Sequence, residues 1–273
     1  MIGEKFKISI GSVPGVYHRA INRNNQDAAY WAESEHGLVA CVLDGCGSGL
    51  YSEIGARLTS RVLCKRALEL LYLQKQGFVF RHGLLEELRL SLINFIRELA
   101  GQLGASFSQV INDYFLFTIV AALITEETTS IFTLGDGLFS LNGETTIIDE
   151  NNQPNYLGYA LVKSDTTRKN PNALDFVLRE EISTREVDSL ILGSDGVVDL
   201  LERKDQLIKI LGVESRVGDL NQFLLEPRYL KNLSALQKRL VVLGVRNRLL
   251  DDDTTMVLIR RKIEESEVSQ CTS

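Results

Sequence analysis

Three nearly apolar segments of this chain run directly into a glycine-rich Asp-Gly sequence. Short apolar runs that end in turn residues are typical of buried strands, and an Asp-Gly pair by itself is a common hairpin turn. A turn accounts for each pair separately, but it does not explain why the pairs recur at the ends of apolar segments. The three places are residues 38–43 before Asp44-Gly45, residues 130–134 before Gly135-Asp136-Gly137, and residues 189–192 before Gly193-Ser194-Asp195-Gly196.

The remaining apolar patterns predict an α+β order of elements. Apolar residues at helical spacing predict two consecutive helices, over about 52–73 and 84–103. This order lacks the strict strand–helix alternation of a doubly wound sheet, and it favours two antiparallel sheets packed face to face and covered by helices. The further expected elements are strands at 6–10, 28–33, 115–124, 138–141, 174–177 and 255–260, and helical segments within 197–248.

Length and composition predict one globular domain. The chain has 273 residues, of which 44% are hydrophobic and 24% charged, and it has only four prolines and no low-complexity tract. No change in composition marks a domain boundary, so we expect a single domain over residues 1–273. Residues 142–172 are rich in Asn, Thr and Asp and predict an irregular flap, and residues 263–273 form a C-terminal tail.

Charge and cysteine content exclude several classes of partner. A net charge of −6 opposes a nucleic-acid surface, which needs clustered Lys and Arg. No apolar run reaches the roughly 18–20 residues that cross a bilayer, and the N-terminus has no apolar signal core, so we expect no membrane partner. The four cysteines form no CxxC pair, which opposes a zinc site and suits a reducing, cytoplasmic location.

Two more acidic positions stand at the margins of predicted strands. Asp27 precedes the strand at 28–33, and the run 251–253 of three aspartates precedes the last strand, although such a run is also typical of a solvated loop. Side chains at the ends of different strands can converge at one rim of a sandwich. Clustered carboxylates repel one another unless they are protonated or bridged by cations. Oxygen-only ligand sets suit magnesium, manganese or calcium.

At these positions the chain resembles the PPM family, the metal-dependent serine/threonine protein phosphatases of type 2C. The resemblance is ordered and runs from about residue 11 to 260. Each of its five short motifs is weak alone, but together they are specific. With His18 upstream of the first motif, the chain most resembles a compact bacterial branch of the family. The motifs are Asn25-Gln26-Asp27, Asp44-Gly45-Cys46-Gly47, Gly135-Asp136-Gly137, Ser194-Asp195-Gly196 with Asp199, and Asp252-Asp253-Thr254-Thr255.

The resemblance implies a four-layer αββα sandwich and a hydrolase that acts on phosphoserine and phosphothreonine. A hydroxide held between two Mg²⁺ or Mn²⁺ ions would attack phosphorus in line, without a phosphoenzyme. The implied partners are a phosphorylated protein substrate and a cognate Ser/Thr kinase, in a signalling role.

The resemblance also implies a role for each acidic position. Asp44 would bridge two ions, and the carbonyl of Gly45 would complete one of them. Asp195 and Asp252 would hold the first ion, and Asp27 with Gln26 would serve the second. Asp136 matches the position of a third, weaker ion. The implied catalytic residues are Asp27, Asp44 and Asp195, and the implied metal ligands are Asp27, Asp44, Gly45, Asp136, Asp195 and Asp252.

The chain departs from the family pattern at three places. Gln26 stands where many members have Glu, which removes one negative charge near the second ion. Asn22 stands where many members carry a phosphate-binding arginine, so His18, Arg19 or Arg23 is the candidate replacement. His18 is a candidate acid as well as a phosphate ligand, although a lone histidine is more often a structural hydrogen-bonding residue. Cys46 stands where some members have a histidine suggested as a general acid; a thiol there is more often a packed residue than a catalyst.

Other functions stay open. The missing arginine and Gln26 leave a phosphatase-like module that binds a partner without turnover as the alternative. An aspartyl-phosphate mechanism needs a second Asp two residues after the nucleophile, where this chain has Cys46. The Leu-rich segments within 200–248 carry no chemical motif and are expected to be covering helices.

Overall fold

The computed structural model describes residues 2–104, 106–150, 154–162, 174–210 and 212–262. Parts of the predicted flap and the whole predicted tail at 263–273 lie outside these ranges. Within the described ranges no helix is both long and apolar enough to cross a membrane.

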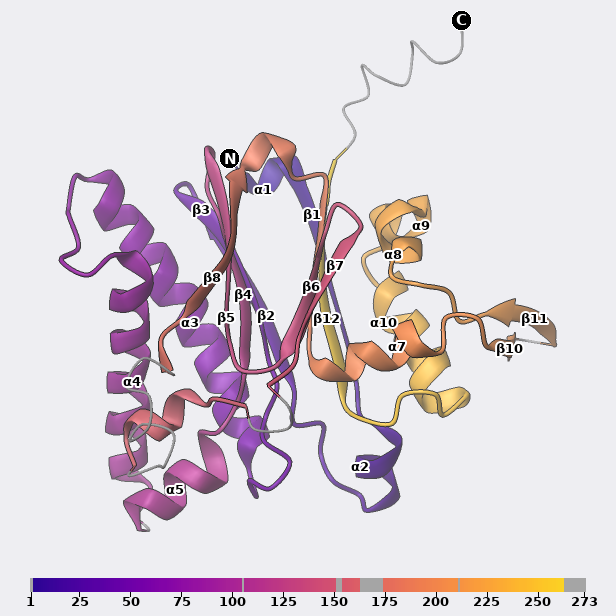
Figure 1. Ribbon diagram of the computed structural model, residues 1–273, viewed down its shortest axis with the longest axis horizontal. Coiled ribbons are helices and arrows are strands. Elements are labelled where there is room, and N and C mark those ends of the chain that lie inside the picture. The colour runs from indigo at the N-terminus through magenta and orange to yellow at the C-terminus, as the bar shows by residue number, and fades with distance from the viewer. Residues whose placement is uncertain (1, 105, 151–153, 163–173, 211, 263–273) are drawn as a thin grey trace, which may run out of the picture.

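Two five-stranded sheets lie face to face, and every pair of neighbouring strands is antiparallel (Figure 1). The first sheet is, in spatial order, β1 (Phe6–Val13), β12 (Thr254–Arg261), β9 (Ser189–Gly193), β6 (Gly137–Leu141) and β7 (Glu144–Ile148). The second sheet is β2 (Ala28–Ser34), β3 (Gly37–Leu43), β4 (Ile119–Ile124), β5 (Thr128–Leu134) and β8 (Val177–Ser183).

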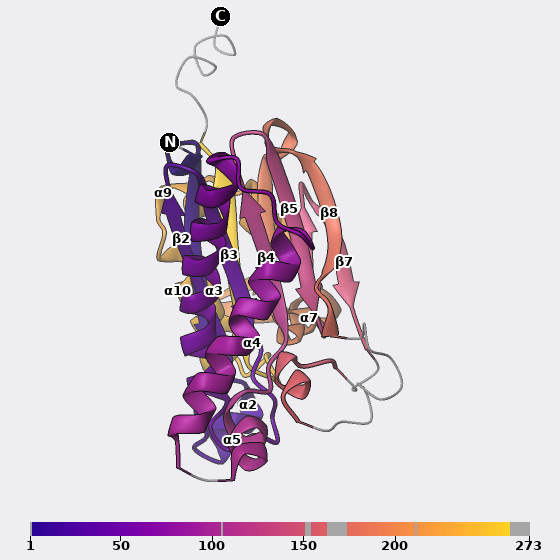
Figure 2. The same cartoon turned by 90° about the vertical axis from the view of Figure 1, so that its left-hand side faces the viewer.

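Helices cover the outer face of each sheet, which completes the predicted αββα sandwich (Figures 1 and 2). Over the second sheet lie α3 (Ser52–Lys75), α4 (Leu84–Gln102) and α5 (Phe107–Tyr114). Over the first lie α7 (Val198–Glu202), α8 (Asn221–Leu225), α9 (Pro227–Lys231), α10 (Ala235–Leu240) and the π-helical turn η5 (Val241–Arg246). The short elements α1 (Ile2–Lys5), α2 (Val16–Ala20), η1 (Leu157–Ala160), η3 (Thr184–Glu186) and η4 (Asp195–Val197) lie in connections.

The strand β3 is apolar throughout because both of its faces are buried. Leu38, Ala40 and Val42 pack between the two sheets, and Val39 and Cys41 pack under α3 and α4. A strand between two apolar layers reads as a continuous hydrophobic run and not as an alternation. This burial on both sides fixes the end of β3, where Asp44 follows.

The structure corrects several predicted boundaries. Residues 144–148, assigned above to the irregular flap, form β7, whose first four residues are exposed at the edge of a sheet and therefore carry no apolar pattern. The strand expected at 174–177 begins only at Val177, and the one expected at 115–124 begins at Ile119. The hairpin of β10 (Leu207–Ile210) and β11 (Val213–Arg216) stands within the region expected to be helical.

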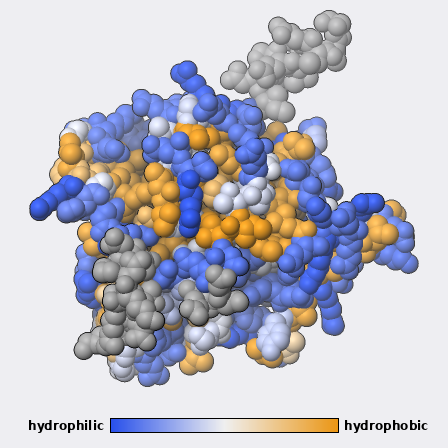
Figure 3. All heavy atoms as spheres, viewed as in Figure 1, coloured by the Kyte–Doolittle hydropathy of each residue, from blue (hydrophilic) through white to orange (hydrophobic). Residues whose placement is uncertain are grey.

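The face of the molecule at strands β7 and β8 is apolar at its centre. Figure 3 shows hydrophobic atoms gathered there, with hydrophilic atoms around them. Both strands are sheet edges, and Ile147, Val177 and Leu178 on them are about half exposed. Apolar side chains of these two edge strands are thus partly exposed on this side.

The contact between α3 and α5 allows a test of the packing. A Cβ on Gly55 of α3 would lie 1.7 Å from the carbonyl oxygen of Tyr114. We expect Gly55→Ala to lower the free energy of unfolding by about 1–3 kcal/mol, because the helices must separate. For a chain of this size that is a fall of several degrees in Tm, measured by differential scanning fluorimetry.

Gly101 of α4 is the matched control, because a Cβ there meets no atom within 4 Å. The same glycine-to-alanine change at 101 removes only backbone freedom, so we expect Tm to stay constant or rise. Equal Tm values for the two variants would contradict this account of the helix contact.

Candidate functional site

The predicted acidic positions meet at one end of the sandwich because the strands that carry them are antiparallel. Ala28 pairs with Leu43, so the start of β2 and the end of β3 bring Asp27 beside Asp44. Gly193 pairs with Met256, so the end of β9 and the start of β12 bring Asp195 toward Asp252. The turn between β5 and β6 adds Asp136 at the same end, the lower end in Figure 1.

A cavity of about 550 Å³ opens at this end. Its walls contain five of the predicted ligand positions, which are Asp44, Gly45, Asp136, Asp195 and Asp252. Asp27 lies behind the wall, only 3% exposed, with its carboxyl group against that of Asp44. Pro154 and Tyr156, from the region predicted as a flap, also line the cavity.

The carboxyl groups are placed too close together to be ionised at once without a counter-charge. Burial raises the pKa of Asp44 well above its usual range, and the charges of Asp27 and Asp195 raise it further. Burial, followed by the charge of Asp253, raises the pKa of Asp27 to about 8. Burial also raises the pKa of Asp136 to about 6. Such a cluster is suited to a bound cation, which would hold the acids in their ionised form.

Two buried oxygen atoms lack a donor. No donor group of the described residues reaches Oδ1 of Asp27 or Oε1 of Gln26. Oδ2 of Asp27 accepts from Ser194 at 2.7 Å, and Nε2 of Gln26 donates to Ser52 Oγ at 2.5 Å and to the carbonyl of Gly49 at 3.0 Å. Buried polar atoms are rarely left unpaired, so the two free oxygens fit a hard cation or the water molecules around one.

Gly45 is needed for close packing beneath the loop. A Cβ there would lie 2.6 Å from the carbonyl oxygen of Gln26 and 2.8 Å from Ser52 Oγ. Any larger residue would push the Asp44-Gly45 segment away from Gln26 and Asp27. The all-oxygen donor set and this close approach fit the ligand roles that the sequence predicts for these residues.

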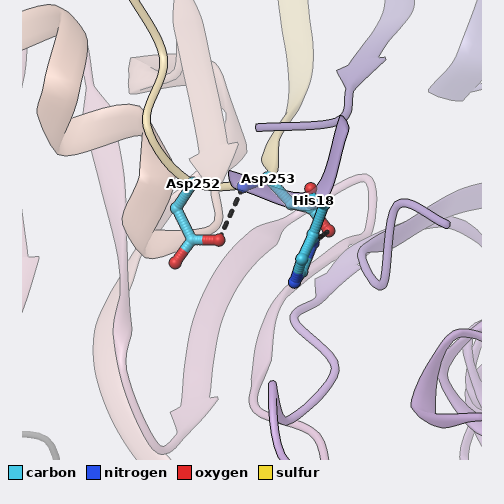
Figure 4. A group of neighbouring side chains, drawn as sticks. All are labelled: His18, Asp252 and Asp253. Carbon is cyan, nitrogen blue, oxygen red and sulfur yellow. Dashed lines mark hydrogen bonds and ion pairs between the residues drawn. The ribbon is translucent and has the colours of Figure 1, made fainter. Parts of the chain in front are cut away.

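The aspartates 251–253 divide into three environments. Asp253 is 3% exposed, its carboxylate accepts from the backbone N–H groups of Gly15 and Gln26, and its Oδ2 lies 2.8 Å from His18 Nδ1. Asp252 is turned toward the cavity and accepts from the N–H of Asp253 (Figure 4). Asp251 pairs with Arg203. Oxygen and nitrogen atoms of His18, Asp252 and Asp253 lie within 4.8 Å of one another, but the oxygens of Asp253 are already occupied by donors.

The three candidate replacements for the missing arginine differ in whether they reach the cavity. His18 and Arg23 line the cavity, whereas Arg19 does not line it and donates to the carbonyls of Gly244 and Val245. The guanidinium of Arg23 donates to the carbonyls of Gly47 and Gly49, so it also holds the loop that follows Asp44.

Cys46 lines the cavity one residue beyond Gly45. Its Sγ lies 3.2 Å from Ser48 Oγ. Burial raises the pKa of this thiol, but hydrogen bonds from Ser48 and Tyr156 outweigh that effect and lower it. The side chain is thus held by its neighbours within the loop.

Residues that support the site were missed from the sequence. Ser194 Oγ joins Asp27 to the backbone N–H of Thr255, and Asp199 accepts from the N–H of Asp251 at 2.6 Å. The backbone N–H of Thr118 donates to the carbonyl of Asp44 at 2.8 Å. Only the position of Ser194 and Asp199 beside Asp195 could have indicated such roles; Thr118 carries no signal in the sequence.

Comparisons with known proteins agree with this geometry. The sequence profile of protein phosphatase 2C matches residues 14–235, and the chain belongs to this family. No protein of curated function matches the chain significantly in sequence.

Several solved structures share the fold. PppA, described as a key regulatory component of the T6SS in Pseudomonas aeruginosa, is 18% identical with a TM-score of 0.55, over 94% of this chain and 98% of that one. A bacterial serine phosphatase variant is 16% identical with a TM-score of 0.54, over 94% and 99%. The serine/threonine phosphatase Stp1 from Staphylococcus aureus is 14% identical with a TM-score of 0.50, over 94% and 96%. At these identities the likeness concerns the fold.

The crowded carboxyl groups predict an unusual pH dependence of stability. Because the pKa of Asp27 is raised to about 8, the folded chain keeps a proton that the unfolded chain loses near pH 4. This contribution is complete below pH 4 and is lost as the pH rises to about 8. With a chelator present, we expect the free energy of unfolding in urea to fall by on the order of a few kcal/mol between pH 5 and pH 8.

Asp27→Asn should reduce this dependence, because the amide has no proton to lose, while Asp44 and Asp136, whose pKa values are also raised, account for the part that remains. Asp188→Asn is the control, since the side chain of Asp188 is 81% exposed and lies away from the cavity. A wild-type protein that is equally stable at both pH values, or more stable at pH 8, would contradict the electrostatic description.

Proposed function

We propose that this protein is a metal-dependent phosphoprotein phosphatase that hydrolyses phosphoserine and phosphothreonine by direct attack of water. The observation that carries the proposal is the cavity in which Asp44 contacts the carboxyl groups of Asp27 and Asp195, with Asp136 and Asp252 on the same wall. Membership of the protein phosphatase 2C family supports the same chemistry.

Each acidic residue has a proposed ligand role. Asp44 would serve two Mg²⁺ or Mn²⁺ ions, together with the carbonyl of Gly45. Asp195 and Asp252 would hold one ion, and Asp27 with Gln26 the other, which would use the two free buried oxygens. Asp136 is proposed for a third, weaker ion. When bound, such ions neutralise charge on phosphate and lower the pKa of bound water toward about 7.

Two side chains with N–H donors at the cavity are proposed to meet the phosphoryl group. Arg23 uses two N–H groups on loop carbonyls, and a guanidinium carries five, so it keeps donors for phosphate oxygens. His18 is the other cavity residue that can donate to the substrate. The remaining wall is strongly acidic, so bound cations would be needed before an anionic substrate could enter.

A phosphorylated protein is the proposed partner, and a cognate Ser/Thr kinase would supply it. Tyr17 and Ile21 line the cavity but are 77% and 60% exposed, which offers apolar contacts for a peptide. The proposed location is the cytoplasm. A chain with few cysteines and no CxxC pair suits a reducing compartment.

Replacement of one ligand tests the proposal. We expect hydrolysis of 4-nitrophenyl phosphate and of a phosphothreonine peptide with manganese, and loss of both activities with chelator. Asp195→Ala should lower kcat by about 100-fold or more, in the range found when preorganised charge stabilisation is removed. The measurement is steady-state kinetics over a manganese titration.

Asp205→Ala is the matched control, because Asp205 is 76% exposed and pairs with Arg216 at the surface. It should leave kcat unchanged. Turnover that ignores both chelator and Asp195→Ala would remove the metal mechanism. A wild-type protein that binds manganese and a phosphopeptide but never releases phosphate would favour the alternative of a binding module.

A further inference from the structure

His18 stands in the cavity with one ring nitrogen already committed. Its Nδ1 lies 2.8 Å from Oδ2 of Asp253 (Figure 4), and His18 lines the cavity. The side chain of His18 is 12% exposed, and that of Asp253 is 3% exposed. A carboxylate buried behind an imidazole in this way fixes the orientation of the ring.

The hydrogen bonds of Asp253 fix which nitrogen of His18 carries the shared proton. Oδ1 accepts from the N–H of Gly15 at 2.8 Å, and Oδ2 accepts from the N–H of Gln26 at 2.6 Å. Because two backbone donors already point at this carboxylate, it acts as an acceptor toward His18 as well. Nδ1 is therefore the donor to Asp253, and Nε2 is left for the cavity.

The backbone around His18 packs directly against the segment that leads to Asp252 and Asp253. A Cβ on Gly15 would lie 2.4 Å from the backbone of Asp252, so only glycine allows this approach. The N–H of Val16 donates to the carbonyl of Leu250 at 2.9 Å. The short helix α2 is thus docked on the segment that ends in Asp252 and Asp253.

No other imidazole is available to the reaction. The chain has three histidines. His36 and His82 line other grooves, and the loop position after Asp44-Gly45 is a cysteine. A serine or threonine alkoxide is a poor leaving group, so the bond to phosphorus breaks more easily when a proton reaches the ester oxygen.

The geometry points to His18 as the proton donor to the leaving group, with Asp253 as its positioning residue; this step rests on the proposed phosphatase function. As water attacks phosphorus, the bond from phosphorus to the ester oxygen breaks, and its electron pair passes to that oxygen. The oxygen takes the proton from Nε2 of His18, which becomes neutral, and the alcohol leaves. The proton released by the attacking water restores the imidazolium.

The test compares leaving groups. His18→Asn keeps an amide N–H near the position of Nδ1 and removes Nε2. We expect kcat for a phosphothreonine peptide to fall by about 100-fold or more. For 4-nitrophenyl phosphate, whose phenolate leaves without a proton, kcat should fall by less than about fivefold, because proton transfer contributes little to such a step.

A second variant separates proton donation from phosphate binding. His18→Gln places an N–H near the position of Nε2 that can hydrogen-bond but cannot be transferred, so we expect the same selective loss. His36→Asn, in another groove, should leave both substrates unaffected. Unchanged Tm values with manganese would show that the variants are folded.

Equal losses on the two substrates, no loss on either, or full rescue by glutamine would each overturn the proton-donor role. If the wild-type protein hydrolyses neither substrate with manganese, the phosphatase function itself fails, and this role with it. A selective loss on the peptide in both His18 variants supports it.

Discussion

The mutual repulsion of buried carboxyl groups around Asp44 is the constraint on which the rest of this structure depends. Three acids from separate strand ends are held in contact, at a place where burial alone raises the pKa of Asp44. The free energy that holds them there comes from the apolar layers on both faces of β3 and from the antiparallel pairs that end beside it. A core of this kind can support a strained cluster because its side chains are packed without freedom to move apart.

That constraint also explains the surroundings of the acids. Ser194 and the backbone N–H groups that reach Asp253 satisfy some carboxylate oxygens and leave others free. The oxygens that remain face the cavity or lie just behind its wall. The pattern of satisfied and free atoms thus separates the acids that position other groups from those that can bind a cation.

Much of this site could be predicted from the sequence because each acid follows or precedes an apolar strand. The strand ends and the order of the motifs were enough to bring Asp27, Asp44 and Asp195 together. Within 251–253 the family motif assigned Asp252 to the ion. The roles of Asp253, which holds the N–H groups of Gly15 and Gln26, and of Asp251, which pairs with Arg203, could not be predicted, since three identical residues in a row differ only in which way the backbone turns them. The edge strand β7 was not predicted, because four of its residues are exposed and the strand therefore shows no alternation of buried and exposed positions.

The backbone conformation at position 22 explains why this chain has asparagine where many family members have arginine. Asn22 has a φ of 55°, in the left-handed region that asparagine tolerates better than arginine. Its N–H donates to the carbonyl of Arg19, and the N–H of Arg23 donates to that of His18, the bonding pattern of a Schellman cap on α2. An arginine at 22 would therefore weaken the end of the helix that carries His18.

The same turn directs Arg23 to the carbonyls of Gly47 and Gly49, beside the cavity. The cap thus presents one cation and one imidazole where the family pattern has a single arginine. Because His18 and Arg23 both lie on this capped turn, changing residue 22 would displace both side chains at once. The loss of the arginine is thus tied to the local fold of α2 and is not by itself a sign of a lost function.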